Sequence, residues 1–335
     1  MVGIWFKWNA PLPVKVVRFL VLLVAVLGGM FVLTTQPSCT HCPPTERQVA
    51  PERLRGHVET LSIKYAPRDY RRIWNLNKCA DYISGEFKAA GAEVSEQTFE
   101  VKGKTYRNII GLFGPVTESR IVVGAHYDSC GDTPGADDNA SGVAGLIELA
   151  CLLGDTDLNQ QVELVAFTLE EPPFFRTGNM GSARHAYRHR QNGVEIEGMI
   201  CLEMIGYFSD EKGSQQFPSA LLKLFYPDTG NFIAVIGSIH DRKLAKKLKE
   251  SMRGATDLPV HSMSAPKGFP GLDFSDHLNY WNHGYTAVMV TDTAFMRNLR
   301  YHRSSDTVET LDFDRMANVV LGVYEGVVDM ANDDE

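Results

Sequence analysis

Short runs of consecutive apolar residues recur along the chain, and each run is followed directly by acidic or imidazole side chains. Apolar runs without alternation are typical of strands that are buried on both faces of a parallel sheet. The sequence therefore predicts buried strands that end in polar groups. The runs and the residues that follow them are 121–123 before His126 and Asp128, 162–169 before Glu170 and Glu171, and 198–202 before Glu203.

Other stretches have helical spacing. After Asp137 and Asp138, apolar residues recur at steps of three, four, seven and eight, which places the aspartate pair at a helix N-terminus. Similar spacing predicts helices over 53–91, interrupted at Pro67 and Arg68, and over 312–330. Strands are expected at 92–101, from Asn108 and at 286–290, whereas 209–232 has a weak pattern and 262–276 has the pattern of a loop. The alternation predicts an α/β fold with a mixed, largely parallel central sheet flanked by helices.

The N-terminal part of the chain differs from the rest. Residues 19–33 are continuously apolar and follow Lys7, Lys15 and Arg18, which is typical of a signal sequence. An uncleaved signal anchor with an extracytoplasmic enzyme is favoured, and a cleaved signal of a secreted or periplasmic protein remains open. The chain then divides into a signal anchor or signal peptide (1–35), a linker (36–51) and one catalytic domain (52–335).

Composition narrows the class of protein. A chain of 335 residues with 44% hydrophobic residues can bury a large core, so it is neither disordered nor fibrous. The net charge of −8 argues against a general nucleic-acid binder. Cys39 and Cys42 could form a small disulfide or have no function, and the other cysteines either pair in an oxidising compartment or pack as thiols.

The polar groups at the strand ends have a chemistry in common. Parallel strands present their carboxyl ends at one edge of a sheet, where ligands collect. His302, in the segment after the strand at 286–290, could reach the same crevice. Two histidines with several carboxylates suit one or two zinc ions better than calcium or magnesium, which prefer oxygen ligands alone.

Short motifs along the chain resemble those of a known enzyme family. HYDS, PGADDNASG, EE, LEM, SDH and YHRSSDT occur in the order and approximate spacing found in the co-catalytic dizinc aminopeptidases, zinc exopeptidases related to glutamate carboxypeptidase II and glutaminyl cyclase. The chain resembles that family from about residue 53 to residue 328. The resemblance implies a metal-dependent peptidase that acts on peptides and binds two zinc ions.

The resemblance also implies roles for individual residues. Asp138 would bridge the two zinc ions, His126 and Glu203 would hold one, and Glu171 and His302 would hold the other. Glu170 would be the general base, and Tyr301 would polarise the substrate carbonyl. Asp128 would orient His126, as metal-bound imidazoles usually require. His277, in the SDH segment, is expected to be structural.

Two departures from the family pattern concern the substrate. Glu203 stands where the family usually has aspartate, and residues 172–177 lengthen the segment after Glu171. The segments 209–232 and 262–276 are expected to wall the mouth of the active site. Five aromatic residues are candidates for an apolar specificity pocket, with ordinary core packing as the alternative. They are Phe174, Phe175, Tyr207, Phe208 and Phe269.

Three functions are compatible with these patterns. An aminopeptidase is favoured, because Glu170 and Glu203 could bind a free α-amine, whereas Arg176 and Arg297 leave a carboxypeptidase open. A glutaminyl cyclase would need one zinc, and retention of all the expected ligands counts against it. A non-catalytic, receptor-like domain of the same fold is the third alternative. The remaining histidines are interpreted as core or solvated residues: His57, His185, His189, His240, His261 and His283.

Overall fold

A computed structural model describes residues 14–38 and 44–333. Its centre is one eight-stranded sheet with the order β1-β2-β4-β3-β5-β8-β6-β7. The strands are β1 (Glu93–Val101), β2 (Lys104–Phe113), β3 (Ser119–His126), β4 (Gln161–Phe167), β5 (Glu195–Leu202), β6 (Ile233–Ser238), β7 (Val260–Ala265) and β8 (Ala287–Thr291). The helices are α1 (Val14–Thr35), α2 (Pro51–Glu59), α3 (Ile73–Ala89), α4 (Gly142–Gly154), α5 (Gly181–Gln191), α6 (Arg242–Ala255), α7 (His277–Asn282) and α8 (Phe313–Ala331).

The middle of the sheet is parallel. Strands β4, β3, β5 and β8 run in the same direction, whereas β2 pairs antiparallel with β4 and β6 pairs antiparallel with β8. β1 and β2 form an antiparallel hairpin at one edge of the sheet. The prediction of a mixed, largely parallel sheet flanked by helices is therefore confirmed.

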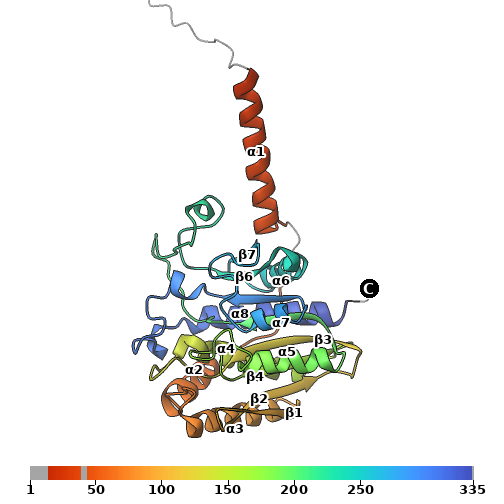
Figure 1. The fold of residues 1–335 in the computed structure, drawn as a ribbon, viewed down its shortest axis with the longest axis vertical. Helices are drawn as coiled ribbons and strands as arrows, with labels where there is room; N and C mark the ends of the chain where they lie inside the picture. The colour runs from red at the N-terminus through yellow and green to blue at the C-terminus, as the bar shows by residue number, and fades with distance from the viewer. Residues whose placement is uncertain (1–13, 39–43, 334–335) are drawn as a thin grey trace, which may run out of the picture.

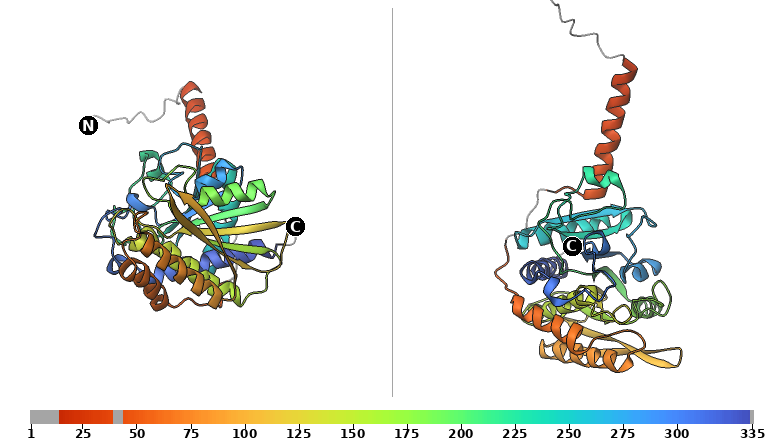
Figure 2. Two further views of the ribbon diagram at one scale, coloured as in Figure 1. Left: turned by 60° about the horizontal axis from the view of Figure 1, so that its bottom comes forward. Right: turned by 90° about the vertical axis from the view of Figure 1, so that its left-hand side faces the viewer.

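Helices cover both faces of the sheet (Figures 1 and 2). Successive residues of β3 point to opposite faces, as the pleat requires. Ile121 and Val123 belong to the core shared with α3, α4, α6 and α8, whereas Val122 belongs to the core on the side of α5 and α7. The apolar run is thus buried on both faces, which explains why it lacks alternation.

One predicted loop proved wrong. The pattern of residues 262–276 predicts loop throughout, but their first residues belong to β7, which pairs with β6 at the edge of the sheet. The pattern does not indicate this strand because Ser262 and Ser264 are buried while His261 and Met263 are only half-buried, so the usual alternation of buried apolar and exposed polar residues is missing. The break at Pro67 and Arg68 agrees with the prediction, and so does the left-handed Gly91, with a φ of 88°, which lies two residues after the end of α3.

The N-terminal region contains α1, the one helix among the described residues that is long and apolar enough to cross a membrane. It projects from the domain (Figure 1) and none of its residues is buried. Farther along the chain, Arg47 donates a hydrogen bond of 2.8 Å to the carbonyl of Asp155 on the surface of the domain. Cys39 and Cys42 lie outside the described residues, and Cys79, Cys130, Cys151 and Cys201 are free thiols.

Candidate metal centre

The predicted site residues come together at the carboxyl edge of the parallel strands. His126 is the last residue of β3, Glu170 and Glu171 follow β4, and Glu203 follows β5. Asp138 lies in η2 (Ala136–Ser141), an irregular turn directly before α4. His302 reaches the same place from the segment after β8.

Three residues at this edge have a left-handed backbone. Leu169, Met204 and His302 have φ angles of 61°, 50° and 57°. Such angles are unfavourable for residues other than glycine and are found preferentially at functional sites. Leu169 precedes Glu170 and Met204 follows Glu203, so these turns redirect the chain where the strands deliver their carboxylates.

Asp138 lies between the two histidines. Its Oδ1 is 3.5 Å from Nε2 of His126, and its Oδ2 is 3.2 Å from Nε2 of His302. Glu203 Oε2 lies 3.3 Å from His126 Nε2, and Glu171 Oε2 lies 3.1 Å from His302 Nε2. The donors therefore form two sets that share one carboxylate.

Glu170 and Tyr301 stand beside these two sets. The closest approach of Glu170 to the His126 ring is 3.9 Å, longer than the contacts of Asp138 and Glu203. The ring of Tyr301 stacks on that of His302, with centroids 3.8 Å apart. Both side chains are thus close to the donors without belonging to either set.

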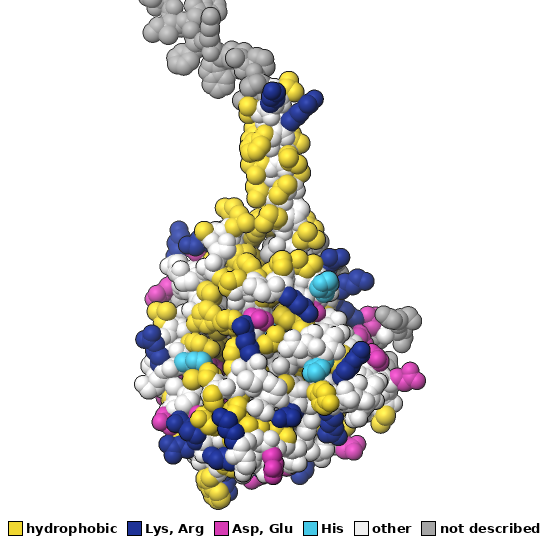
Figure 3. Space-filling model, in the orientation of Figure 1, with side chains coloured by type: hydrophobic (Ala, Val, Ile, Leu, Met, Phe, Trp, Pro, Cys, Tyr) yellow, Lys and Arg dark blue, Asp and Glu magenta, His cyan; other side chains and the backbone are white. Residues whose placement is uncertain are grey.

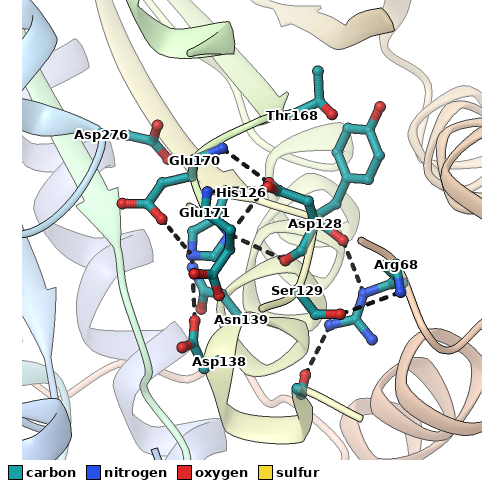
Figure 4. A network of polar contacts seen from close by, with 12 residues as sticks. Arg68, His126, Asp128, Ser129, Asp138, Asn139, Thr168, Glu170, Glu171 and Asp276 are labelled. Carbon is teal, nitrogen blue, oxygen red and sulfur yellow. Dashed lines mark hydrogen bonds and ion pairs between the residues drawn. The ribbon is translucent and has the colours of Figure 1, made fainter. Parts of the chain in front are cut away.

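Asp128 ties two of the strand ends together (Figure 4). Its carboxylate accepts hydrogen bonds of 3.1 Å from the backbone N–H groups of Glu170 and Glu171. The same carboxylate lies 3.5 Å from Nδ1 of His126, whose closer neighbour, at 3.2 Å, is the carbonyl of Asp128 itself. Asp128 therefore fixes the glutamate pair as well as the imidazole.

The aspartate pair divides into two roles. Both carboxylate oxygens of Asp137 accept hydrogen bonds, Oδ1 from the Gly206 backbone at 3.1 Å and Oδ2 from Asn298 Nδ2 at 2.7 Å. Asp306, in the YHRSSDT segment, accepts hydrogen bonds from the backbone N–H groups of both Asp137 and Asp138. Asp137 thus holds the backbone, and Asp138 is left free to face the imidazoles.

Further residues that hold the site were not identified from the sequence. Ser275 donates a hydrogen bond of 2.6 Å to Glu203 Oε2. Asn139 links the start of α4 to the end of β5, because its Oδ1 accepts from the N–H groups of Gly142 and Met204. Ser275 is the first residue of the SDH motif, and Asn139 directly follows Asp137 and Asp138. Their places in these motifs were the signals that could have indicated the two roles.

Arg68 is a fully buried arginine beneath the site (Figure 4). Its guanidinium donates hydrogen bonds of 2.7 to 2.9 Å to the carbonyls of Leu61, Tyr127, Pro134 and Gly135. These bonds hold the segment between His126 and Asp138. In the sequence, Arg68 marks only a helix break, since a single arginine carries no local pattern.

Burial and like charges dominate the electrostatics. Burial raises the pKa of Glu171 to about 8 and that of Glu170 well above its ordinary value. Burial would lower the pKa of His126, but the charges of Glu203 and Glu170 raise it well above its usual range. The site therefore holds more carboxylates than its two imidazoles can neutralise, which favours a bound cation.

The donor atoms fit a metal. His126 Nε2 and Glu171 Oε1 are buried without a hydrogen-bond partner, and both residues belong to groups that could hold an ion. One such group is His126, Asp138 and Glu203, and another is Glu171, His302 and Cys130. Buried polar atoms without partners are costly unless they bind a ligand, and mixed nitrogen, oxygen and sulfur donors suit zinc.

A third group of metal-type residues lies elsewhere. Glu163 accepts hydrogen bonds from Nε2 of His185 at 3.0 Å and Nε2 of His189 at 2.9 Å, and Arg120 approaches it at 3.2 Å. The Glu163 carboxylate is thus paired within the protein on both of its oxygens. The cluster is a buried structural network, in agreement with the prediction that these histidines are core residues.

An apolar pocket opens beside the donors. Glu203 and Tyr301 line it, together with residues from both segments that are predicted to wall the mouth of the site. None of the five aromatic candidates lines it, and Phe174, which is buried against Tyr70, shows the core packing that was the alternative. The aromatic residues that line it are Phe217, Tyr226, Phe232, Phe274, Phe295 and Tyr301.

The chain is similar in sequence to proteins of Escherichia coli and Uncinocarpus reesii. The uncharacterized protein YfbL of Escherichia coli K12 is 44% identical over 313 residues, which cover 91% of this chain and 95% of that protein. Leucine aminopeptidase 1 of Uncinocarpus reesii is 27% identical over 236 residues, covering 65% of this chain and 54% of that protein.

Solved structures and a family pattern complete the comparison. LapB of Legionella pneumophila matches with a TM-score of 0.67 at 20% identity, covering 92% of this chain and 75% of that chain. A glutaminyl cyclase of Bacteroides thetaiotaomicron bound to N-acetylhistamine matches with a TM-score of 0.63 at 19% identity, covering 86% and 99%. Residues 108–326 match peptidase family M28. This match covers more than half of the chain, and the Escherichia coli relative is 44% identical over 91% of it. The chain therefore belongs to peptidase family M28.

Proposed function

We propose that this chain is a zinc-dependent aminopeptidase that releases N-terminal residues from peptides by attack of water on the first peptide carbonyl. The observation that carries the proposal is the position of Asp138, with one carboxylate oxygen toward each imidazole. His126 and Glu203 would hold one zinc ion, Glu171 and His302 the other, and Asp138 would bridge them. Cys130 adds a sulfur donor beside the second set.

The roles of the side chains follow from their surroundings. Bound zinc supplies a Lewis acid for the carbonyl oxygen and makes water more acidic at neutral pH. Glu170, whose pKa is raised by burial, accepts the proton of the attacking water and passes it to the leaving amine. Tyr301, which lines the pocket, donates a hydrogen bond to the oxygen of the tetrahedral intermediate.

The residues around the site favour binding of the N-terminal end of a peptide substrate over binding of its C-terminal end. Glu203 lies at the pocket wall and offers a carboxylate to a substrate α-amine. Arg297 already donates to the carbonyl of Phe232 at 2.9 Å and is buried, and Arg176 is paired with Asp273. Neither arginine lines the apolar pocket beside the metal donors.

The experiment that tests the proposal compares two reactions of the full chain. We expect zinc to copurify at about two ions per chain, and leucyl-p-nitroanilide hydrolysis to be abolished by a chelator and restored by zinc. Cyclisation of an N-terminal glutamine with a zinc content near one would support the glutaminyl cyclase alternative instead. If the fully zinc-loaded chain catalyses neither reaction, the non-catalytic, receptor-like domain is the remaining alternative.

The pocket sets an expectation for specificity. Ala234, on β6, lines the pocket, so Ala234→Phe should fill part of it. We expect the ratio of kcat/KM for phenylalanyl over alanyl anilides to fall about tenfold, because a lost apolar subsite costs about 1–3 kcal/mol. The alanyl substrate is the internal control for folding. An unchanged ratio would exclude this pocket as the side-chain subsite.

Finally, we propose that α1 is a retained membrane anchor with the catalytic domain on the extracytoplasmic side. Its length of 22 residues corresponds to about 33 Å, which matches the hydrocarbon core of a bilayer. Its last turn is hydrogen-bonded to the domain, which supports retention over cleavage.

A further inference from the structure

The end of α1 contacts the catalytic domain directly through hydrogen bonds. The carbonyl of Thr35 accepts hydrogen bonds of 2.8 Å from Lys249 Nζ and from Ser262 Oγ. Lys249 also donates to the carbonyl of Gln36, and its side chain is almost completely buried. The last carbonyl of the helix is therefore satisfied by α6 and β7. A helix held in this way fixes the orientation of the domain relative to α1.

Apolar side chains are exposed beside this attachment. The ring of Phe31 in α1 lies 5.7 Å from that of Phe225, directly after the short helix η3 (Ala220–Leu224). In η3, Leu224 is 68% exposed and Leu221 is 37% exposed. Figure 3 shows hydrophobic side chains continuing from α1 onto the adjoining surface of the domain. If the domain were not anchored in a membrane, these leucines would contact water. If α1 anchors the domain, they would contact lipid.

Basic residues accompany the leucines. Lys223 lies between them in η3 and is exposed. Lys246 and Arg253 lie on α6, and both are near enough to Lys249 to contribute to lowering its pKa. Figure 3 shows Lys and Arg side chains around the base of α1. On a chain with a net charge of −8, such a cluster is a local exception.

We infer that this basal face, defined as Leu221, Lys223, Leu224, Lys246 and Arg253, rests on the surface of an anionic lipid bilayer. The two leucines enter the interfacial layer and the cations contact lipid headgroups, which is the combination that holds peripheral segments on membranes. The inference rests on the proposed retention of α1. It does not depend on the proposed peptidase activity.

The contact has a consequence for the active site. Tyr226 donates a hydrogen bond of 2.7 Å to the carbonyl of Ser262, whose side chain binds the end of α1. Tyr226 and Ser262 also line the apolar pocket. The pocket is therefore held on the side of the domain that faces the bilayer, so the site receives chain ends that lie close to the membrane surface.

Photocrosslinking in reconstituted full-length protein tests the inference. A photoreactive benzoylphenylalanine replaces Leu224, Val24 in α1, or Trp74 on α3, in vesicles of equal parts phosphatidylcholine and phosphatidylglycerol. All three positions are exposed, and α3 lies at the opposite end of the molecule from α1 (Figure 1). We expect lipid adducts at Val24 and Leu224, with a yield at Leu224 about tenfold above that at Trp74.

The outcomes separate the two ideas. An adduct at Val24 without one at Leu224 would overturn the inference about the basal face and leave the proposed anchor intact. The absence of an adduct at Val24 would refute both the anchor and the basal-face contact. Replacing phosphatidylglycerol by phosphatidylcholine should lower the yield at Leu224, and an equal yield would overturn the anionic preference. Hydrolysis of a soluble anilide by the same samples reports on the peptidase separately.

Discussion

Glu170→Gln is expected to lower kcat by about 10²- to 10⁴-fold while the zinc content stays unchanged. The amide has nearly the same shape as the carboxylate, so packing is preserved, but it cannot accept the proton of the attacking water. Glu170 is buried and lies 3.9 Å from the His126 ring, farther than the other carboxylates that contact that ring. Metal content and kcat on leucyl-p-nitroanilide are measured on the same preparation.

A matched substitution controls for the loss of a buried charge. Glu148 is also a buried glutamate, but its partners are Arg53 and His57, away from the metal centre. Glu148→Gln should lower the Tm and leave kcat nearly unchanged. Full activity in Glu170→Gln, with Glu148→Gln behaving as described, would remove Glu170 from the mechanism.

Asp138→Ala is expected to have the second large effect, the loss of zinc and of activity together. Asp138 is the carboxylate shared by the two donor sets, so its removal takes a ligand from each. Ligand loss should weaken zinc binding by more than about 100-fold, since even changes to groups that only support ligands cost about 10- to 100-fold. Zinc per chain, measured after dialysis against a competing chelator, gives the result directly.

Asp137→Asn is the matched control for this variant. Asp137 is adjacent in sequence and equally buried, but it accepts hydrogen bonds from Gly206 and Asn298 and does not face the imidazoles. We expect Asp137→Asn to lose about 1–3 kcal/mol of unfolding free energy and to keep its zinc. If Asp137→Asn lost zinc and Asp138→Ala kept it, the assignment of the two aspartates would be reversed.

The Glu163 cluster illustrates how the tertiary context separates similar groups of residues. Glu163, His185 and His189 are histidine and carboxylate donors like those of the metal centre, and they are buried like His126, Asp138 and Glu203. Their donor atoms are hydrogen-bonded to one another, whereas His126 Nε2 and Glu171 Oε1 have no such partner. Residue type alone could not make this distinction, because it depends on which atoms remain free after folding.

The sequence predicted the site residues that come directly after buried strands. A strand buried on both faces must be apolar throughout, so the first polar residue marks its end, and parallel pairing aligns these ends at one edge. For this reason the pattern along the chain is enough to predict that His126, Glu170, Glu171 and Glu203 meet. Asp138, at the start of a predicted helix, and His302, after the strand at 286–290, were further candidates for this edge, and the family resemblance then implied their roles.

The pocket and the supporting residues could not be predicted in this way. The lining of the pocket comes from several loops and from strands β6, β7 and β8, so no single period along the chain describes it. The predicted aromatic residues were near the site in sequence, but Phe174 packs on Tyr70, and Phe232 and Phe295 take part in the pocket instead. The interface between α1 and the domain likewise joins residues more than 200 positions apart.

The amino-acid sequence by itself determined the α/β architecture, the sheet edge at which the chemistry is placed and the apolar character of α1, because each depends on a local pattern of burial. Only the tertiary structure decided that Asp137 supports while Asp138 faces the imidazoles, that Arg68 holds the loop between them and β3, and that Lys249 and Ser262 attach α1 to the domain. Those assignments depend on hydrogen bonds between distant residues, and such bonds are satisfied only when the whole chain has folded.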